Sequence, residues 1–325
     1  MNSKLHISIV SPFYNEEANV EAFYSELKTV LDELPYKHDM VFVDDGSTDN
    51  TLQIMQELAS KDPAITVLAL SRNFGHQMAL TAGLDYATGN VVVVMDSDLQ
   101  HPPELIPSLI EKYLAGADVV YAVREKPSGL PSIKSLTSQL FYWFLEKMTN
   151  LQFTPGSADF RLMRSEVVKT LQEMRETHRY LRGLVPWIGW TTATIHYHQP
   201  ERRSGKPSYN LRKSIQLARY GMFSFSTVPL ELITWLGLGL ASLGGIYLAY
   251  ILVISLCGIA VQGWTSTISV VLVLGGVQLL SFGVVAQYVG MIFEQVKNRP
   301  LYVLKYKKIS SELNQERLTD DRQTT

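Results

Sequence analysis

The sequence predicts an α/β protein: an open, mostly parallel β-sheet with helices on both faces, followed by an interfacial helix and two transmembrane helices. Three observations carry this prediction. Short β-branched runs alternate with helical patterns up to about residue 210, two long uncharged stretches occupy the last third of the 325-residue chain, and lysine and arginine gather at the outer ends of those stretches. Alternating strands and helices are typical of a parallel sheet covered on both faces.

The expected strands are short apolar runs, and continuous runs of this length suit strands that are buried on both faces of a sheet. They cover residues 7–10, 40–43, 65–70, 91–95 and 119–122. Between them, apolar residues recur at helical spacing over residues 17–34, 50–59, 75–87 and 103–114. Ligands of such sheets bind beyond the carboxyl ends of the strands, so the residues directly after each strand are the first candidates for a site.

The last third of the chain predicts two membrane spans. From Tyr220 to Phe293 the only charged residue is Glu231. Residues 229–257 and 265–292 are each long enough to cross a hydrocarbon core about 30 Å thick. Basic residues flank only the outer ends, so the positive-inside rule places both ends in the cytoplasm. A buried helical hairpin of a soluble protein is the alternative, although two uncharged stretches this long are rare in a soluble core.

These patterns divide the chain into four parts. We expect a cytoplasmic α/β domain over residues 1–210, an amphipathic juxtamembrane helix over 211–228, two spans over 229–294 and a basic cytoplasmic segment over 295–325. The juxtamembrane helix would lie on the anionic inner leaflet, and a solvated connector is its alternative. The polar tail after Ser310 is expected to be disordered.

The composition excludes several classes of function. A net charge of −2 gives no electrostatic reason to expect nucleic acid as a partner. The single cysteine, Cys257, excludes an intrachain disulfide and a cysteine-rich zinc site. No secretory signal pattern opens the sequence, which agrees with a cytoplasmic N-terminal domain.

Two carboxylates directly follow the fourth expected strand. Asp96 and Asp98 are two residues apart and can point toward one oxygen-preferring cation, with Gln100 and His101 close behind. Hard cations such as Mg²⁺ bind one or two carboxylates and complete their shell with water and phosphate oxygens. The pair therefore predicts a metal site that holds a nucleoside diphosphate leaving group. Taken alone, two aspartates at this spacing are as often part of a simple turn as part of a metal site.

Polar clusters also follow the first two strands. Asp44 or Asp45 could accept hydrogen bonds from a base or a ribose hydroxyl, and Tyr14 could flank a base. The alternative is a capping cluster for the next helix, which Ser47 or Asp49 would serve. Because three strand ends carry polar side chains toward the same edge, their convergence is a stronger signal than any one motif.

These motifs resemble a known family. Residues 11–17 (SPFYNEE) and 43–51 (VDDGSTDNT) resemble the nucleotide-binding pattern of family 2 glycosyltransferases with the GT-A fold. Residues 71–75 (SRNFG) and 95–104 (MDSDLQHPPE) resemble the branch that contains dolichyl-phosphate mannose synthase and bactoprenol-phosphate glucosyltransferases. The resemblance covers nearly all of residues 5–300, including the two spans.

The resemblance implies an inverting transfer of a sugar from a nucleotide to polyprenyl (undecaprenyl) phosphate at the cytoplasmic face of a bacterial inner membrane. Glucose from UDP-glucose is the expected donor, while UDP-N-acetylglucosamine, a UDP-aminopentose and GDP-mannose remain open. The implied cofactor is Mg²⁺ or Mn²⁺. A homo-oligomer is a further expectation, because glycines in the first span would allow close helix contacts.

Site residues follow from the resemblance by matching position. The metal ligands would be Asp96, Asp98 and Gln100, the catalytic residues Asp159 and Asp98, and the acceptor-phosphate residues Arg124 and Lys134. The nucleotide-sugar would contact Pro12, Tyr14, Asn15, Glu16, Asp44, Asp45, Arg72, Ser97 and Arg202.

The roles of two of these residues stay open. Related enzymes place an acidic residue beside the acceptor at the position of Asp159, and it is sometimes called the base. An acceptor phosphate is already an anion near neutral pH, so Asp159 could instead orient the acceptor, and a helix N-cap is the structural alternative. Around Arg202, residues 201–209 (ERRSGKPSY) match the family loop that closes over the pyrophosphate, but the Ser/Thr-Lys pair of that loop is missing.

Two other functions compete with this interpretation. A processive polysaccharide synthase would carry a Gln-x-x-Arg-Trp signature and more spans than two, and the sequence has neither. A non-catalytic membrane scaffold or a flippase subunit would not need the carboxylates Asp96, Asp98 and Asp159. His196 and His198 alternate like the exposed face of a strand and are interpreted as structural.

Overall fold

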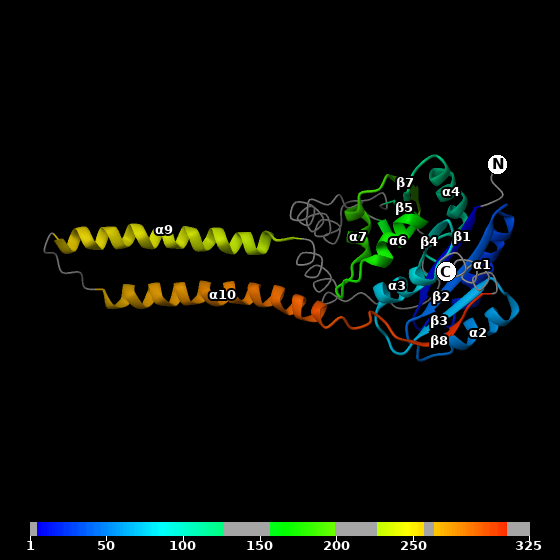
Figure 1. Ribbon diagram of the computed structural model, residues 1–325, viewed down its shortest axis with the longest axis horizontal. Helices are drawn as coiled ribbons and strands as arrows, with labels where there is room; N and C mark the ends of the chain where they lie inside the picture. Colours follow the sequence, from blue (N-terminus) through cyan, green and yellow to red (C-terminus); the bar gives the residue numbers. More distant parts are fainter. Residues whose placement is uncertain (1–4, 126–156, 199–225, 257–262, 311–325) are drawn as a thin grey trace, which may run out of the picture. The chain divides into compact units, whose positions relative to one another are not determined.

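The computed structural model describes residues 5–125, 157–198, 226–256 and 263–310 (Figure 1). The chain forms two compact units. A sheet unit comprises Met1–Trp143, Leu151–Asn210 and Pro300–Thr325, and a helical unit comprises Phe144–Asn150 and Leu211–Arg299.

The sheet unit is built on one eight-stranded sheet in the order β7-β5-β6-β4-β1-β2-β3-β8. The strands are β1 (His6–Phe13), β2 (Lys37–Asp44), β3 (Ile65–Leu70), β4 (Val91–Val94), β5 (Val119–Arg124), β6 (Ser157–Arg164), β7 (Thr192–Tyr197) and β8 (Leu304–Lys308). All neighbouring pairs are parallel except those that involve β6 and β8. The predicted mostly parallel α/β sheet is therefore confirmed.

Helices cover both faces of this sheet. They are α1 (Val20–Glu33), α2 (Thr51–Lys61), α3 (His76–Tyr86), the short 3₁₀ turn η1 (Pro103–Leu105), α4 (Ile106–Leu114), α6 (Ser165–Glu173) and α7 (Leu181–Ile188). Alternate residues of a strand point to opposite faces. Ile9 accordingly joins the core beneath α1 and α2, whereas Val10 faces α3, where a Cβ on Gly83 would lie 2.3 Å from its Cγ1. Only a glycine allows α3 to pack this closely on the sheet.

Two strands, β6 and β8, were not predicted from the sequence, and β7 was indicated only by the alternation of His196 and His198, of which His196 is exposed on that strand. β6 interrupts its apolar residues with Asp159, Arg161 and Arg164, so it does not read as a buried run, yet it lies between β4 and β5. The helix N-cap interpretation of Asp159 is wrong, because the residue lies within this strand. β7 contains His196 and forms one edge. β8 lies within residues 295–325, which the sequence analysis separated from the domain, and it forms the other edge beside β3.

The helical unit contains two long apolar helices, α9 (Val228–Leu256) and α10 (Trp264–Val296), which run alongside each other (Figure 1). Within them, Val228–Tyr247 and Val273–Val296 are long and apolar enough to cross a membrane, with mean hydropathies of 1.4 and 1.5. They coincide with the two predicted spans. Residues 211–225 and the tail after Ser310 lie outside the described residues, so the interfacial helix and the disordered tail stay predictions.

A buried carboxylate fastens β1 to β2 at the end of the sheet where these two strands begin. Asp39 is fully buried, its Oδ1 accepts a hydrogen bond of 2.7 Å from Ser8 Oγ, and the same oxygen lies 2.8 Å from His6 Nε2. Ser8 Oγ in turn accepts a hydrogen bond of 2.8 Å from the Gly89 amide, just before β4. One carboxylate thus serves the three central strands.

We expect Asp39→Ala to lower the free energy of unfolding by about 3 kcal/mol, because it leaves buried polar partners of the carboxylate unpaired. Asp32→Ala is the matched control: Asp32 is half-exposed, pairs with Lys28 along α1, and should cost less than about 0.5 kcal/mol. Urea unfolding of the purified chain in detergent, followed by circular dichroism, measures both. An equal loss of unfolding free energy in the two variants would contradict the stabilising role of the buried Asp39 carboxylate.

Candidate active site

The loop after β1 is bonded to the chain after β2 through Asn15 and Glu16, two residues that the sequence predicts to contact the nucleotide-sugar. Asn15 adopts a left-handed backbone conformation with a φ of 54°. Its backbone N–H donates a hydrogen bond of 3.0 Å to Ser47 Oγ, and its side-chain Oδ1 accepts one of 2.9 Å from the backbone N–H of Thr48. The Glu16 amide donates to Thr51 Oγ1 over 2.9 Å. Asn15 and Glu16 therefore have a structural task at this edge of the sheet, whatever else they bind.

Asp45 joins the loop after β2 to the loop after β3. Its Oδ1 accepts a hydrogen bond of 2.8 Å from the Phe74 amide, and its Oδ2 accepts one of 3.0 Å from the Gly75 amide. The contact is tight, since Gly46 has a φ of 70° and a Cβ built on it would lie 2.4 Å from the carbonyl carbon of Arg72. Burial raises the pKa of Asp45, although these amides oppose the shift. Asp45 places residues 71–75 and, through them, the start of α3.

The loop that carries Asp96 and Asp98 closes on itself after β4. The Asp96 amide donates to His101 Nδ1 over 2.9 Å, and the Gln100 amide donates to Asp98 Oδ1 over 3.2 Å. The buried hydroxyl of Ser97 donates to the Pro12 carbonyl over 2.8 Å, which ties this loop to β1. The structure thus brings Pro12 and Ser97 together at this edge of the sheet.

Asp159 lies at the centre of a cluster of opposite charges. It is fully buried, and its Oδ1 accepts hydrogen bonds from Arg161 over 2.6 Å and from Arg182 Nε over 3.1 Å. Its Oδ2 accepts one from a second nitrogen of Arg182 over 2.8 Å and lies 3.1 Å from His76 Nε2. A carboxylate offers about four lone-pair sites, so all of them are occupied by three cationic side chains.

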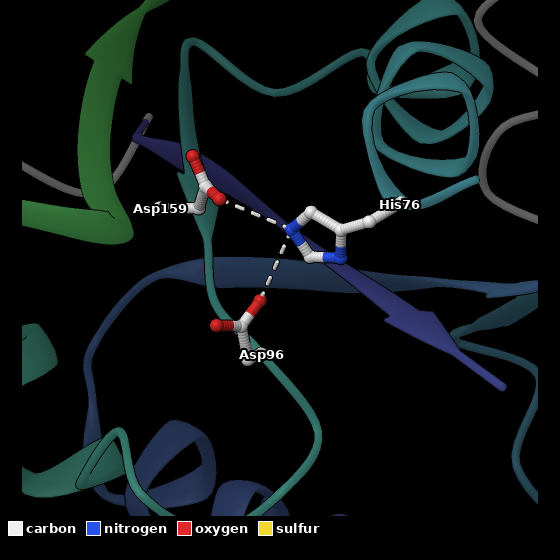
Figure 2. A group of neighbouring side chains, drawn as sticks. All are labelled: His76, Asp96 and Asp159. Carbon is white, nitrogen blue, oxygen red and sulfur yellow. Dashed lines mark hydrogen bonds and ion pairs between the residues drawn. The ribbon is translucent and has the colours of Figure 1, made fainter. Parts of the chain in front are cut away.

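His76 links Asp159 to the loop after β4. Figure 2 shows the two carboxylates of Asp159 and Asp96 facing the same ring nitrogen, with Asp96 Oδ1 3.5 Å from His76 Nε2. Desolvation alone would lower the pKa of His76, but the two carboxylates raise it to about 9. The imidazole is therefore protonated at neutral pH and donates to Asp159. Burial opposes ionisation of Asp159, yet Arg182, His76 and Arg161 hold its pKa well below the usual value.

This edge of the sheet offers ligand atoms for a metal. His76, Asp96 and Asp159 bring one ligand atom each within 4.8 Å of one another and could hold an ion. That set would need His76 to lose its proton and Asp159 to give up hydrogen bonds. The oxygen donors of Asp96 and Asp98 suit a hard cation better. Asp96 Oδ1 supports this choice, because it is buried and has no hydrogen-bond partner among the described residues.

A buried phenol also lies close to these carboxylates. Tyr197 ends β7 and packs edge-on against Phe160, with 6.2 Å between the ring centres. Burial together with the negative charges of Asp96 and Asp98 raises its pKa to about 12. The hydroxyl therefore stays protonated, and Tyr197 closes this side of the cluster with a neutral polar group.

The remaining predicted residues are placed as follows. Tyr14 is 47% exposed at the sheet edge, Arg72 is exposed and stacks over the Phe74 ring at 4.1 Å, and Arg124 is exposed at the end of β5. Asp44 is buried and accepts a hydrogen bond of 3.1 Å from the Ser47 amide. Lys134 and Arg202 lie outside the described residues, so nothing structural tests their assignments.

Four residues of the cluster were missed by sequence reasoning: His76, Arg161, Arg182 and Tyr197. His76 follows a strand-end motif, so the rule that strand ends bear ligands could have included it. Arg161 and Arg182 gave no signal, because an arginine in an unrecognised strand and one in a short helix resemble surface residues.

Comparison with known proteins assigns the family. Residues 8–172 match the model of glycosyl transferase family 2. The SfII prophage-derived bactoprenol glucosyl transferase of Shigella flexneri is 40% identical over 302 residues, which cover 93% of this chain and 98% of that protein. An uncharacterized glycosyltransferase of Bacillus subtilis (strain 168), YkcC, is 39% identical over 306 residues, or 94% and 95% of the two chains.

A solved structure, glucosyl-3-phosphoglycerate synthase from Mycobacterium tuberculosis in complex with Mn²⁺, UDP and phosphoglyceric acid, is more distant. It is 20% identical, with a TM-score of 0.48 over 67% of this chain and 76% of that one. No residue role is transferred from a likeness at that level.

We expect Gly46→Ala to displace the loop of residues 71–75, because the new Cβ would meet the backbone at Arg72. The free energy of unfolding should fall by about 2 kcal/mol more than in Gly116→Ala. Gly116 is a matched control, since its φ of 106° is also positive but a Cβ there meets nothing within 4 Å. Urea unfolding of both variants checks this, and equal losses would show that backbone strain alone matters.

Proposed function

The chain belongs to glycosyl transferase family 2, and we propose that it transfers glucose from UDP-glucose, with inversion, to polyprenyl (undecaprenyl) phosphate. The observation that carries the proposal is end-to-end similarity to proteins named bactoprenol glucosyl transferase. At 39–40% identity the similarity covers at least 93% of this chain and so includes the two apolar helices as well as the sheet unit.

The loop residues suit the two ends of a nucleotide-sugar. We assign the base and ribose to the edge formed by Tyr14, Asp44 and the loop of Arg72, where an exposed aromatic ring, a carboxylate and a guanidinium lie after successive strands. The diphosphate would lie at the loop of Asp96 and Asp98. These two residues would hold Mg²⁺ or Mn²⁺, which supplies positive charge to the departing diphosphate.

Asp159 is better suited to positioning than to proton removal. A general base works best when its pKa lies near the working pH. The positive charges of Arg182, His76 and Arg161 hold the pKa of Asp159 well below its usual value, and so far below a neutral working pH. The acceptor phosphate is already anionic near neutral pH and needs little deprotonation. We therefore assign Asp159 the task of fixing Arg182 and His76 beside the reacting groups, where their positive charges face the incoming phosphate.

The two apolar helices fit a lipid acceptor. A polyprenyl phosphate keeps its tail in the bilayer and presents its phosphate at the level of the headgroups, where an enzyme using a soluble nucleotide must meet it. We propose that α9 and α10 span a bacterial inner membrane with both ends in the cytoplasm, as the flanking basic residues favour. Arg124, at the end of β5, and Lys134 would bind the acceptor phosphate.

One assay separates this function from its rivals. Membranes that contain the chain are incubated with labelled sugar nucleotides and undecaprenyl phosphate, and the chloroform-soluble label is counted. We expect a labelled lipid with UDP-glucose. A lipid labelled only from another donor would correct the sugar, a water-soluble polymer would indicate a processive synthase, and no product from any donor would indicate a scaffold or flippase subunit.

Asp96→Ala should abolish formation of the labelled lipid, at least about a hundredfold below the wild type, because it removes a ligand of the cation that would neutralise the departing diphosphate. The variant should still be found in the membrane fraction in wild-type amounts. Asp32→Ala on the exposed side of α1 serves as the control and should keep full activity. Full activity of Asp96→Ala would overturn the site assignment.

Removal of divalent ions tests the metal separately. Washing the membranes with EDTA should stop transfer, and adding Mg²⁺ or Mn²⁺ should restore it, because the carboxylate pair would otherwise repel the diphosphate. Titrating each ion while following the initial rate identifies the better one. Undiminished transfer in EDTA would show that the positive charge comes from the protein alone.

A further inference from the structure

The chain returns from α10 to the sheet unit and forms its edge strand β8. After Val296, the last residue of α10, residues 301–308 run to β8, which pairs antiparallel with β3. We call residues 301–308 the return segment. Besides the β8–β3 pairing and a hydrogen bond from Lys308 Nζ to the Ala59 carbonyl, Tyr302 and Val303 of this segment contact the stretch of chain that carries His76.

The first contact holds the end of α3. Tyr302 donates from its hydroxyl to Asp85 Oδ2 over 2.7 Å, and Arg175 donates to both oxygens of Asp85 over 2.8 and 3.0 Å. Asp85 is the penultimate residue of α3, and its side chain is only 11% exposed. Burial and the neighbouring Asp85 raise the pKa of Tyr302, so the phenol remains a neutral donor.

The second contact holds the loop before α3. The Ser71 amide, at the first residue of the loop 71–75, donates to the Val303 carbonyl over 2.8 Å and so continues the pairing of β3 with β8 by one position. Two adjacent residues of the return segment, Tyr302 and Val303, therefore form hydrogen bonds near the two ends of the stretch 71–86. His76 lies between these two hydrogen bonds along the chain. Its Nε2 is 3.1 Å from Asp159 Oδ2 and 3.5 Å from Asp96 Oδ1.

Asp45 fixes the same stretch from the other side, through the amides of Phe74 and Gly75. Gln77 accepts a hydrogen bond of 2.9 Å from the Leu181 amide at the start of α7, close to Arg182. Residues 71–86 are thus held near both ends by the return segment, and on either side of His76 by Asp45 and by the start of α7. A movement at Asp85 would be passed to His76 through the rigid helix α3, and a movement at Ser71 would be passed to it through the loop of residues 71–75.

We propose that the return segment is a strap that places His76 against Asp159 and Asp96, and that Tyr302 is a positioning residue for sugar transfer. The inference rests on the proposed function for its activity readout. It gives the segment after the second apolar helix a task in the active site: the last part of the chain to leave the helical unit completes the support of α3. Catalysis tolerates little misplacement, since a shift of about 1 Å can cost about a hundredfold in rate.

Tyr302→Phe tests the strap with the loss of one oxygen atom. In full-length protein in membranes, we expect kcat for lipid-linked product to fall about tenfold while KM for the nucleotide-sugar changes less than about twofold, because His76 lies beside the acceptor side of the cluster. Asp85→Asn should act in the same direction. Tyr306→Phe is the matched control: this tyrosine lies on β8 in the same segment but is 37% exposed, and it should behave as wild type.

Hydrogen exchange followed by mass spectrometry provides a readout that does not need the reaction. Peptides covering residues 71–86 should exchange faster in Tyr302→Phe than in wild type or Tyr306→Phe, while peptides of β1 and β2 stay unchanged. If wild type makes no lipid product from any donor, the proposed function has failed, and this exchange pattern alone decides on the strap. Unchanged exchange over 71–86 would overturn the inference, as would an unchanged kcat in an active enzyme or a loss of stability with kcat per folded molecule intact.

Discussion

The structure depends on one buried carboxylate. Asp159 lies inside the sheet unit with no exposed surface, and a lone charge there would cost several kcal/mol. Arg161, Arg182 and His76 compensate it from β6, α7 and α3, so three elements must meet at one point for the charge to be tolerated. That requirement fixes where α3 and α7 dock, and it leaves a positively charged group of side chains next to Asp96. The same interaction thus organises the fold and prepares a site for anionic reactants.

Around Asp159, some polar residues of the strand-end loops bond to neighbouring loops, whereas others keep an oxygen atom that could bind a ligand. The sequence does not distinguish these two roles. The side chains of Asn15 and Asp45 accept hydrogen bonds from neighbouring loops, and the backbone amide of Glu16 donates to Thr51 at the start of α2. Asp96 contributes an oxygen with no hydrogen-bond partner in the described part of the chain. A loop can keep such an oxygen buried without a hydrogen bond only when its neighbours keep the loop rigid, because a flexible loop would turn the carboxylate toward water. The structural residues are therefore part of the reason why the binding residues can work.

The chain passes from the helical unit back to the sheet unit after Arg299, and this connection matters for the site. Family 2 membership and two apolar helices together fit an enzyme that takes a soluble donor to a lipid acceptor. The return segment adds that the chain leaving α10 is bonded to Ser71 and Asp85, which flank His76. The part of the chain that follows the two apolar helices is thereby built into the support of His76.

The sequence by itself determined the five parallel strands, their helices, the two apolar helices and the strand-end motifs. Each of these is a local pattern: a β-branched run, a helical period, an uncharged stretch, or acids after a strand. Only the tertiary structure decided the rest. β6 was missed because its charges at Asp159, Arg161 and Arg164 resemble a surface segment until their partners are known. β8 was missed because five residues with three lysines look like a solvated tail, and their place comes from pairing with β3. Arg182 and Tyr302 take their roles from residues 23 and 217 positions away, and contacts over such distances leave no period in the sequence.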